Sequence, residues 1–129
     1  MRTIGAALVG LGLAGAASAA PVSALGTWVV TKVENDPGMR ATALVDDDPS
    51  YLGAVLRIAP SGITWDTGRT NGEGTYDGCA APRLAPGAGG VAVTCGGAAW
   101  GPGATLTPLG ANRLRLDWYD GGVLTLTRD

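Results

Sequence analysis

The sequence predicts an all-β fold, a small antiparallel up-and-down β-barrel with one disulfide and room for one short helix. No stretch of the 129 residues shows sustained helical periodicity. Short runs rich in β-branched residues recur at regular spacing, separated by many of the 22 glycines and 8 prolines. This pattern is typical of an antiparallel barrel or sandwich. About eight such runs are present, which fits an up-and-down barrel.

Residues 1–19 predict a cleaved secretory signal peptide. Arg2 provides a positive charge, residues 4–16 are apolar, and Ala17, Ser18 and Ala19 form a small-residue cleavage site. Cleavage after Ala19 leaves residues 20–129 as a single barrel domain, expected in the periplasm of a bacterium or outside the cell. The segment is short and rich in glycine and alanine, so no membrane insertion is expected after cleavage.

The chain contains two cysteines, Cys79 and Cys95. In an exported protein they predict one disulfide, because only one pairing is possible. Closing the loop between them corresponds to roughly 3 kcal/mol of stabilisation, a large share for so small a domain. A metal site made of two cysteines without histidine is the weaker alternative.

The last strands are the clearest elements of the sequence. Alternating residues run from 114 to 119 and from 123 to 128 around an Asp120-Gly121 turn, which strongly favours a β-hairpin. Further strands are expected at residues 26–33, 54–59, 63–66, 91–95 and 104–109. Residues 67–78 and 96–103 are expected to be loops, and residues 79–90 irregular. Residues 39–45 fit either a strand or an extended connection.

The segment from Asp46 to Gly53 begins like a short helix. Asp48 occupies an N-cap position, Pro49 the first helical position, and Gly53 the position where such a helix would end. The three consecutive aspartates lack the alternating ligand spacing of a calcium loop. A solvated, capped turn is therefore preferred to a calcium site.

Composition argues against several classes of function. The net charge of −2 offers no basic surface for nucleic acid or for an anionic membrane. Histidine, the commonest general base, is absent, and no serine lies in a Gly-x-Ser-x-Gly motif. Nothing in the sequence singles out two of the acidic residues as the carboxylate pair of a glycosidase. The chain is therefore expected not to be an enzyme, and no catalytic, cofactor-binding or metal-binding residue is assigned.

Gly26-Thr27-Trp28 resembles the start of the first strand of a lipocalin-like, or calycin, barrel. That superfamily places an arginine near the end of its last strand, where it stacks on the tryptophan at the closed end of the barrel. Arg128 matches this position, and it shares the inward parity of Leu124 and Leu126. The resemblance implies that Arg128 stacks on Trp28. Such a stack, if desolvated, would stabilise the barrel by about 2 kcal/mol.

A narrower resemblance covers residues 95–118. Cys95, Ala98-Ala99-Trp100, Leu106, Leu109-Gly110 and Leu114 are similar to bacterial periplasmic inhibitors of secreted metalloproteases. Those proteins are small, disulfide-bonded, exported barrels whose mature N-terminal residues enter the protease cleft. The resemblance assigns that role to residues 20–24. The family places its cysteines more widely, and its upstream motif is not clearly present here.

Three functions remain open from the sequence. A monomeric binding barrel would hold a small apolar or envelope-derived molecule in a cavity lined by Leu56, Ile58, Leu116 and Leu124. A hydrolase inhibitor would instead have a filled barrel. It would also expose its N-terminal lead or the glycine-flanked Trp100 as a contact residue, although Trp100 could equally plug one end. A structural envelope protein is the third possibility, and each of the others implies an unknown small-molecule or protein partner.

Overall fold

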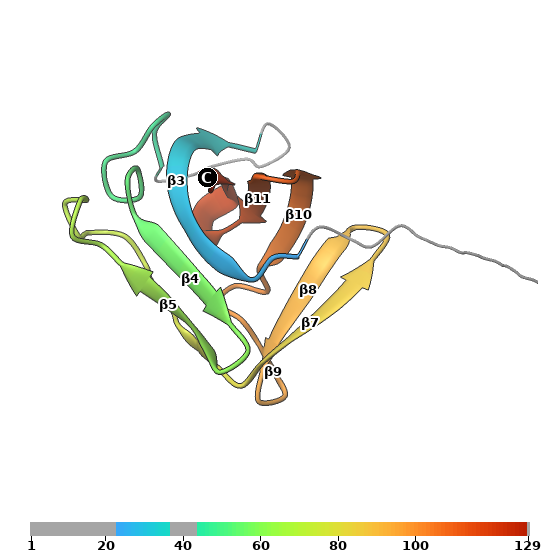
Figure 1. Ribbon diagram of the computed structural model, residues 1–129. Coiled ribbons are helices and arrows are strands. Elements are labelled where there is room, and N and C mark those ends of the chain that lie inside the picture. The colour runs from blue at the N-terminus through green and yellow to red at the C-terminus, as the bar shows by residue number, and fades with distance from the viewer. Residues whose placement is uncertain (1–22, 37–43, 129) are drawn as a thin grey trace, which may run out of the picture.

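The computed structural model describes residues 23–36 and 44–128. Over these ranges ten strands form one antiparallel sheet, which curls into a nearly closed barrel (Figure 1). The expected all-β barrel with a Cys79–Cys95 disulfide is confirmed. The predicted signal peptide and residues 20–22 lie outside the described residues, as does most of the ambiguous segment 39–45. Among the described residues, no helix is both long and apolar enough to cross a membrane.

The elements follow one another closely along the chain. A 3-10 turn, η2 (Tyr119–Gly121), separates the last two strands. The strands are β3 (Gly26–Asn35), β4 (Val55–Ala59), β5 (Gly62–Asp66), β6 (Cys79–Ala80), β7 (Pro82–Gly87), β8 (Gly90–Cys95), β9 (Ala98–Ala99), β10 (Thr105–Gly110), β11 (Arg113–Asp117) and β12 (Gly122–Thr127).

The barrel closes through its strand order. Neighbours run β6-β5-β4-β3-β12-β11-β10-β8-β7, with β9 paired to β8 as a side branch. The two ends of this order, β6 and β7, are separated only by Ala81, so they form one bent strand that reaches from β5 to β8. Counted this way the barrel has eight strands, in agreement with the expected number.

The terminal hairpin forms as expected and completes the barrel. The four residues 118–121 connect the strands, and Asp120 and Gly121 have φ values of 57° and 71°, in the left-handed region that Asp-Gly pairs favour in hairpin connections. Strand β12 then pairs with β11 on one side and with β3, the first strand described, on the other. The first and last of the described strands are therefore neighbours, as in an up-and-down barrel.

Residues 79–90 form the strands β6 and β7, so the expectation of irregular structure there is wrong. Strand β7 pairs with β8 along its whole length, from Pro82 opposite Cys95 to Gly87 opposite Gly90. Its other edge pairs with no strand among the described residues. A proline lacks the N–H that a central strand needs, but an edge strand accommodates Pro82 and Pro86.

The segment after Asp48 is a turn, and the short helix considered there does not form. The Asp48 carboxylate accepts hydrogen bonds from the Ser50 backbone N–H at 3.0 Å and from the Ser50 hydroxyl at 2.6 Å. Leu52 N–H reaches the Asp48 carbonyl oxygen at 2.9 Å, which completes a single turn. Gly53, with φ of +88°, then redirects the chain into β4. The preferred interpretation of a capped turn is confirmed.

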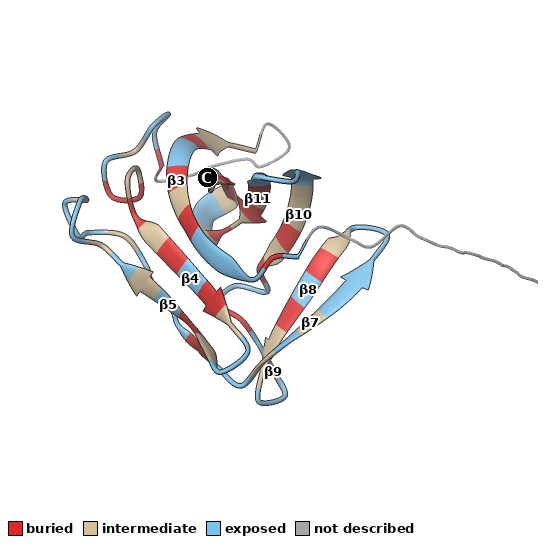
Figure 2. Cartoon of the chain, in the orientation of Figure 1, coloured by how far each residue is buried: buried red, intermediate tan, exposed pale blue. Residues whose placement is uncertain are grey.

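Inward-facing side chains fill the barrel. Buried and exposed positions alternate along the strands, as Figure 2 shows for β4 and β8. Burial of one Leu or Ile side chain stabilises the folded state by about 2 kcal/mol. The side chains with at most 3% exposure include Trp28, Val30, Val33, Leu56, Ile58, Ile63, Val93, Leu106, Leu114, Leu116, Leu124 and Leu126.

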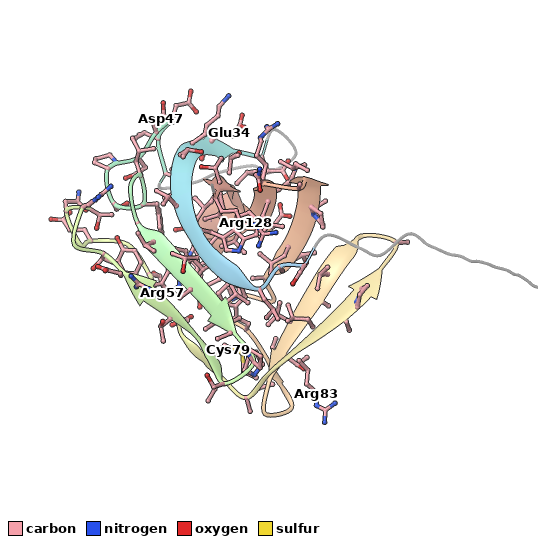
Figure 3. The ribbon with its side chains drawn as sticks, in the orientation of Figure 1. Glu34, Asp47, Arg57, Cys79, Arg83 and Arg128 are labelled. Carbon is pink, nitrogen blue, oxygen red and sulfur yellow. A yellow bond between two sulfur atoms is a disulfide. The ribbon has the colours of Figure 1, made fainter. Side chains whose placement is uncertain are left out.

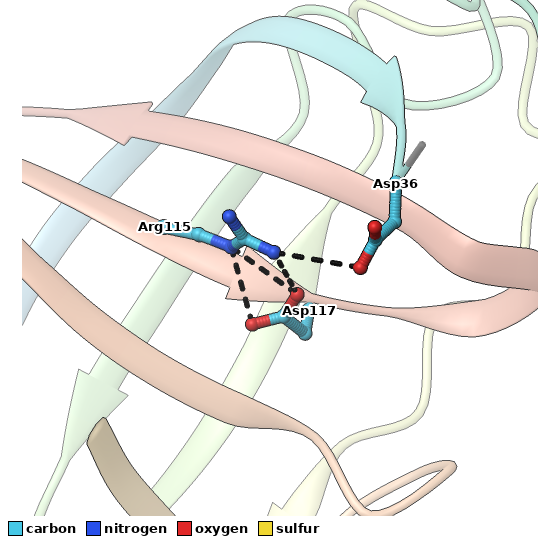
Figure 4. Close-up of polar contacts among 3 residues, drawn as sticks. All are labelled: Asp36, Arg115 and Asp117. Atoms are coloured by element: carbon cyan, nitrogen blue, oxygen red, sulfur yellow. Dashed lines mark hydrogen bonds and ion pairs between the residues drawn. The ribbon is translucent and has the colours of Figure 1, made fainter. Parts of the chain in front are cut away.

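A surface ion cluster ties the end of β3 to β11 across β12 (Figure 4). Arg115 Nη2 lies 2.8 Å from Asp117 Oδ1 and 3.7 Å from Asp36 Oδ2. All three side chains are more than a third exposed. Exposed pairs of this kind contribute at most about 1 kcal/mol, so the cluster supports the barrel without holding it together.

Gly90→Ala tests the close approach of β8 to β10. Gly90 has a φ of +114°, and an added Cβ would lie 2.7 Å from Thr107 Oγ1 and 2.9 Å from the Leu106 carbonyl oxygen. We expect the substitution to lower the free energy of unfolding by about 2–3 kcal/mol, because both backbone and packing must shift. Chemical denaturation measures the loss.

Gly89→Ala is the matched control, because nothing lies within 4 Å of the Cβ that it would add. Its effect should stay within about 0.5 kcal/mol. Equal losses in the two variants would mean that β8 does not approach β10 closely.

Candidate functional site

Trp28 and Arg128 close one end of the barrel. The Arg128 guanidinium carbon lies 4.2 Å from the centre of the Trp28 ring. Arg128 also donates to the carbonyl oxygen of Leu25 at 2.6 Å and to that of Ala111 at 3.1 Å. Figure 3 shows Arg128 inside the curve of β3. The structure thus stacks Arg128 on Trp28, and the arginine holds both the segment before β3 and the β10–β11 turn.

The other three tryptophans close the opposite end. Trp65 and Trp100 both donate their indole N–H to the Asp77 carbonyl oxygen, at 3.1 and 2.9 Å. Trp118 donates to the Thr75 carbonyl oxygen at 2.8 Å, and its ring packs against both other indoles. The three indoles therefore pin residues 75–77 across the mouth of the barrel.

Trp100 has 0% exposure, so its side chain is not available as an exposed contact residue. Its backbone N–H donates to the Val93 carbonyl oxygen at 3.2 Å, which folds the loop after β9 back onto β8. Of the two roles left open by the sequence, the plug agrees with this burial. The glycines on either side of Trp100 let the chain turn so that the indole faces inward.

Tyrosines add a second layer at the same end. The Tyr51 hydroxyl accepts the Thr75 backbone N–H at 2.9 Å, and burial raises the pKa of Tyr51. The Tyr119 hydroxyl donates to the Asp77 carboxylate, and this hydrogen bond raises the pKa of Tyr119. Tyr76 donates to the Ser50 carbonyl oxygen. These polar groups are engaged in holding loops together.

Two hollows of about 340 and 320 Å³ lie among the loops at this end. They share Asp120; the walls of the first also include Asp36, Asp117 and Trp118, and those of the second are mainly polar, with Asp48 and Glu73. In the described part of the chain, no cluster of acidic or cysteine side chains is arranged to hold a metal ion. Nothing else at these hollows points to a ligand.

The four residues predicted to line a ligand cavity belong to the packed core. Leu56, Leu116 and Leu124 have 0% exposure and Ile58 has 2%. None of them lines the hollows of about 320, 340, 410 and 430 Å³ among the described residues. Leu116 and Leu124 pair on neighbouring strands within the core, so the candidate binding surface has to be sought elsewhere.

A mainly apolar hollow lies beside the Trp28 end, and we call it the apolar groove. One wall is the N-terminal lead, residues 23–25, together with Pro60 of the β4–β5 turn. The other wall is the β7–β8 hairpin, residues 82–95, which we call the arm. In Figure 1 the arm and the β4–β5 hairpin diverge like the two sides of a V. The groove has a volume of about 430 Å³, and the arm contributes Pro82, Leu84, Pro86 and Val91 to it.

The groove has the chemistry of a site for an uncharged ligand. Among the described residues no charged side chain lines it, and the hydroxyl of Ser23 in its wall accepts the Leu25 backbone N–H at 3.1 Å. Pockets for small molecules usually have volumes of 300–1,000 Å³ and mainly apolar walls. Sequence reasoning missed this groove because it expected no strand at residues 79–90. The signal present was the alternation Pro82, Leu84, Pro86, which puts three apolar residues on one face of an extended segment.

Comparisons of the chain with family models, with curated protein sequences and with solved structures returned no match.

Arg128→Ala should destabilise the protein by about 2 kcal/mol, because it removes the stack on Trp28 and two hydrogen bonds to backbone carbonyls. The free energy of unfolding is read from denaturation. Arg113→Ala is the control, since Arg113 is exposed near the same end of the barrel. If the two variants lose the same stability, Arg128 has no special part in closing the barrel.

The Asp48 turn gives a prediction about pH. Hydrogen bonds from Ser50 lower the pKa of Asp48 below its ordinary value of 3.8. A carboxyl group whose pKa is lower in the folded state stabilises that state at pH values above its unfolded-state pKa. This contribution disappears as the pH falls through the folded-state pKa. We therefore expect Ser50→Ala to lower the melting temperature at pH 7, with a difference from the unsubstituted protein that shrinks below about pH 4. Ser61→Ala, at an exposed site, should show no such trend. A difference that is independent of pH would assign the effect of Ser50 to packing alone.

Proposed function

We propose that this chain is an exported, non-catalytic, lipocalin-like binding protein that holds a small apolar molecule in the apolar groove. The observation that carries the proposal is the groove itself, with a volume of about 430 Å³ and no charged side chain in its walls. A site of this composition favours an uncharged molecule, because a buried charge would have no partner there.

The buried core supports a position for the ligand beside the barrel. Leu56, Leu116 and Leu124 have 0% exposure and line none of those hollows, so the groove is preferred to the barrel axis as the site. The groove is instead bounded by the lead, which Trp28 and Arg128 hold at Ala24 and Leu25. Trp28 and Arg128 thus also set the position of one wall of the groove.

A hydrolase inhibitor is the second candidate, and the filled barrel is the observation that favours it. In the resembling inhibitors the N-terminal residues enter the enzyme cleft. Here Ala24 is buried and its carbonyl oxygen accepts the Trp28 indole N–H at 2.8 Å. The part of the predicted lead that is free to enter a cleft would therefore end at Ser23, which is exposed.

Leu84→Asp tests the proposed binding site. We expect the oxidised mature protein, residues 20–129, to bind the uncharged fluorophore N-phenyl-1-naphthylamine. Leu84→Asp should weaken this binding at least about tenfold, because it places a carboxylate on the apolar wall. Fluorescence titration measures the dissociation constant.

Ala85→Asp is the matched control. It introduces the same charge one residue away on β7, where the side chain is exposed and does not line the groove. Its affinity for the fluorophore should stay within about twofold of the original protein's. Equal weakening by both substitutions, or no binding by the original protein, would contradict the proposed site.

The inhibitor function has its own test. Deleting residues 20–22 should abolish inhibition of a secreted metalloprotease while leaving fluorophore binding unchanged. Inhibition that survives the deletion would rule out the N-terminal mode of action.

A further inference from the structure

We propose that the Cys79–Cys95 disulfide regulates the apolar groove, locking the arm against the barrel when it is oxidised and letting the arm swing away when it is reduced. The inference rests on the proposed function, because it concerns the control of that same site. It follows from how the arm is attached to the rest of the barrel.

The arm is a complete hairpin with weak connections to the rest of the sheet. Within it, β7 and β8 pair at six positions. Towards the barrel, β8 pairs with β10 at only two positions, Thr105 with Ala92 and Leu106 with Val91. On the other side, β6 pairs with β5 at only two positions. The strands opposite, β12 and β3, pair at six positions. The arm is therefore the part of the sheet with the fewest ladder bonds holding it in place.

A bend at Ala81 marks where the arm leaves the barrel. Ala81 has a φ of 49°, in the left-handed region that a residue with a side chain rarely adopts. It lies between β6, which pairs with β5, and β7, which pairs only with β8. Rotation at this residue changes the angle between arm and barrel without breaking the β7–β8 ladder.

The disulfide spans this bend. Cys79 lies in β6, on the barrel side of Ala81, and Cys95 lies at the end of β8, opposite Pro82 on the arm side. Their Cα atoms are 5.2 Å apart. Figure 3 places Cys79 near the base of the V formed by the arm and the β4–β5 hairpin. A covalent bond across the vertex fixes the angle of the V, and four of the eight residues that line the groove are on the arm.

A dithiol reductant opens this lock by ordinary thiol–disulfide exchange. One thiolate of the reductant attacks the Cys95 sulfur, which is the more exposed of the two, and the Cys79 thiolate leaves. The second thiol of the reductant then displaces Cys95 and closes the reductant's own disulfide. Two electrons pass to the protein, and both cysteines end as thiols after protonation. The arm is then held by the two β8–β10 pairs, by the buried side chains of Val91 and Val93, and by the loop after β9, whose Trp100 N–H donates to the Val93 carbonyl oxygen.

Hydrogen exchange of the oxidised and the reduced mature protein tests the proposal. On reduction with dithiothreitol, the amides of β7 and β8 should exchange at least about tenfold faster, while those of β11 and β12 change by less than about twofold. The dissociation constant of N-phenyl-1-naphthylamine should rise about tenfold, because the arm carries half of the groove. The variant C79A/C95A should behave like the reduced protein.

Val123→Ala controls for a general loss of stability, since Val123 is buried in β12 away from the arm and the disulfide stays intact. It should raise exchange across the barrel without a preference for β7 and β8. Reduction of the folded protein remains a valid test even if C79A/C95A fails to fold.

The two proposals fail in different ways. Unchanged or uniform exchange on reduction overturns the lock, whatever the fluorophore does. Selective exchange at the arm without any fluorophore binding by the oxidised protein keeps the hinge and overturns the groove as a binding site. Fluorophore binding that is the same in both redox states, with selective exchange at the arm, overturns regulation of the site.

Discussion

The described structure depends on the hydrogen bonds of its four indoles. These bonds hold chain segments that lie outside the sheet and are not fixed by pairing with a strand. Trp28, Trp100 and Trp118 are buried and Trp65 is half-buried, and each directs its N–H to a backbone carbonyl outside the sheet: Trp28 to Ala24, Trp65 and Trp100 to Asp77, and Trp118 to Thr75. A hydrogen bond of this kind contributes about 1 kcal/mol. The indoles satisfy these carbonyls and cover both ends of the core, in a chain without phenylalanine.

Closure at both ends limits where the proposed ligand can bind. A barrel of eight strands encloses only enough room for its own side chains or for one small ligand. Here the interior is taken by leucines such as Leu116 and Leu124, and residues 75–77 cover one mouth. The remaining apolar surface lies where the sheet is least continuous, between the lead and the arm. The position of the groove is thus a consequence of how completely the rest of the barrel is packed.

Local patterns predicted much of this fold from the sequence. The Asp120-Gly121 pair predicted the last hairpin, and the parity of Arg128 placed it on the inner side, where it meets Trp28. The loop partners of Trp65 and Trp118 were out of reach, because residues 67–78 contain four glycines and no pattern that identifies which carbonyls face inward. The groove was missed for a related reason: whether Leu84 lies on a strand depends on pairing with β8, which is not a local property.

The disulfide lies where the pairing of the sheet is short, since β6 pairs with β5 at only two positions. Between β5 and β8 the barrel wall is a bent strand, β6–β7, that pairs with each neighbour over part of its length. Functional surfaces tend to be formed by the least stable parts of a fold, because a wall that moves must have few ladder bonds. A covalent link at such a wall supplies rigidity without adding ladder bonds, and it can be removed chemically. The disulfide is therefore well placed to act as the proposed lock on the apolar groove.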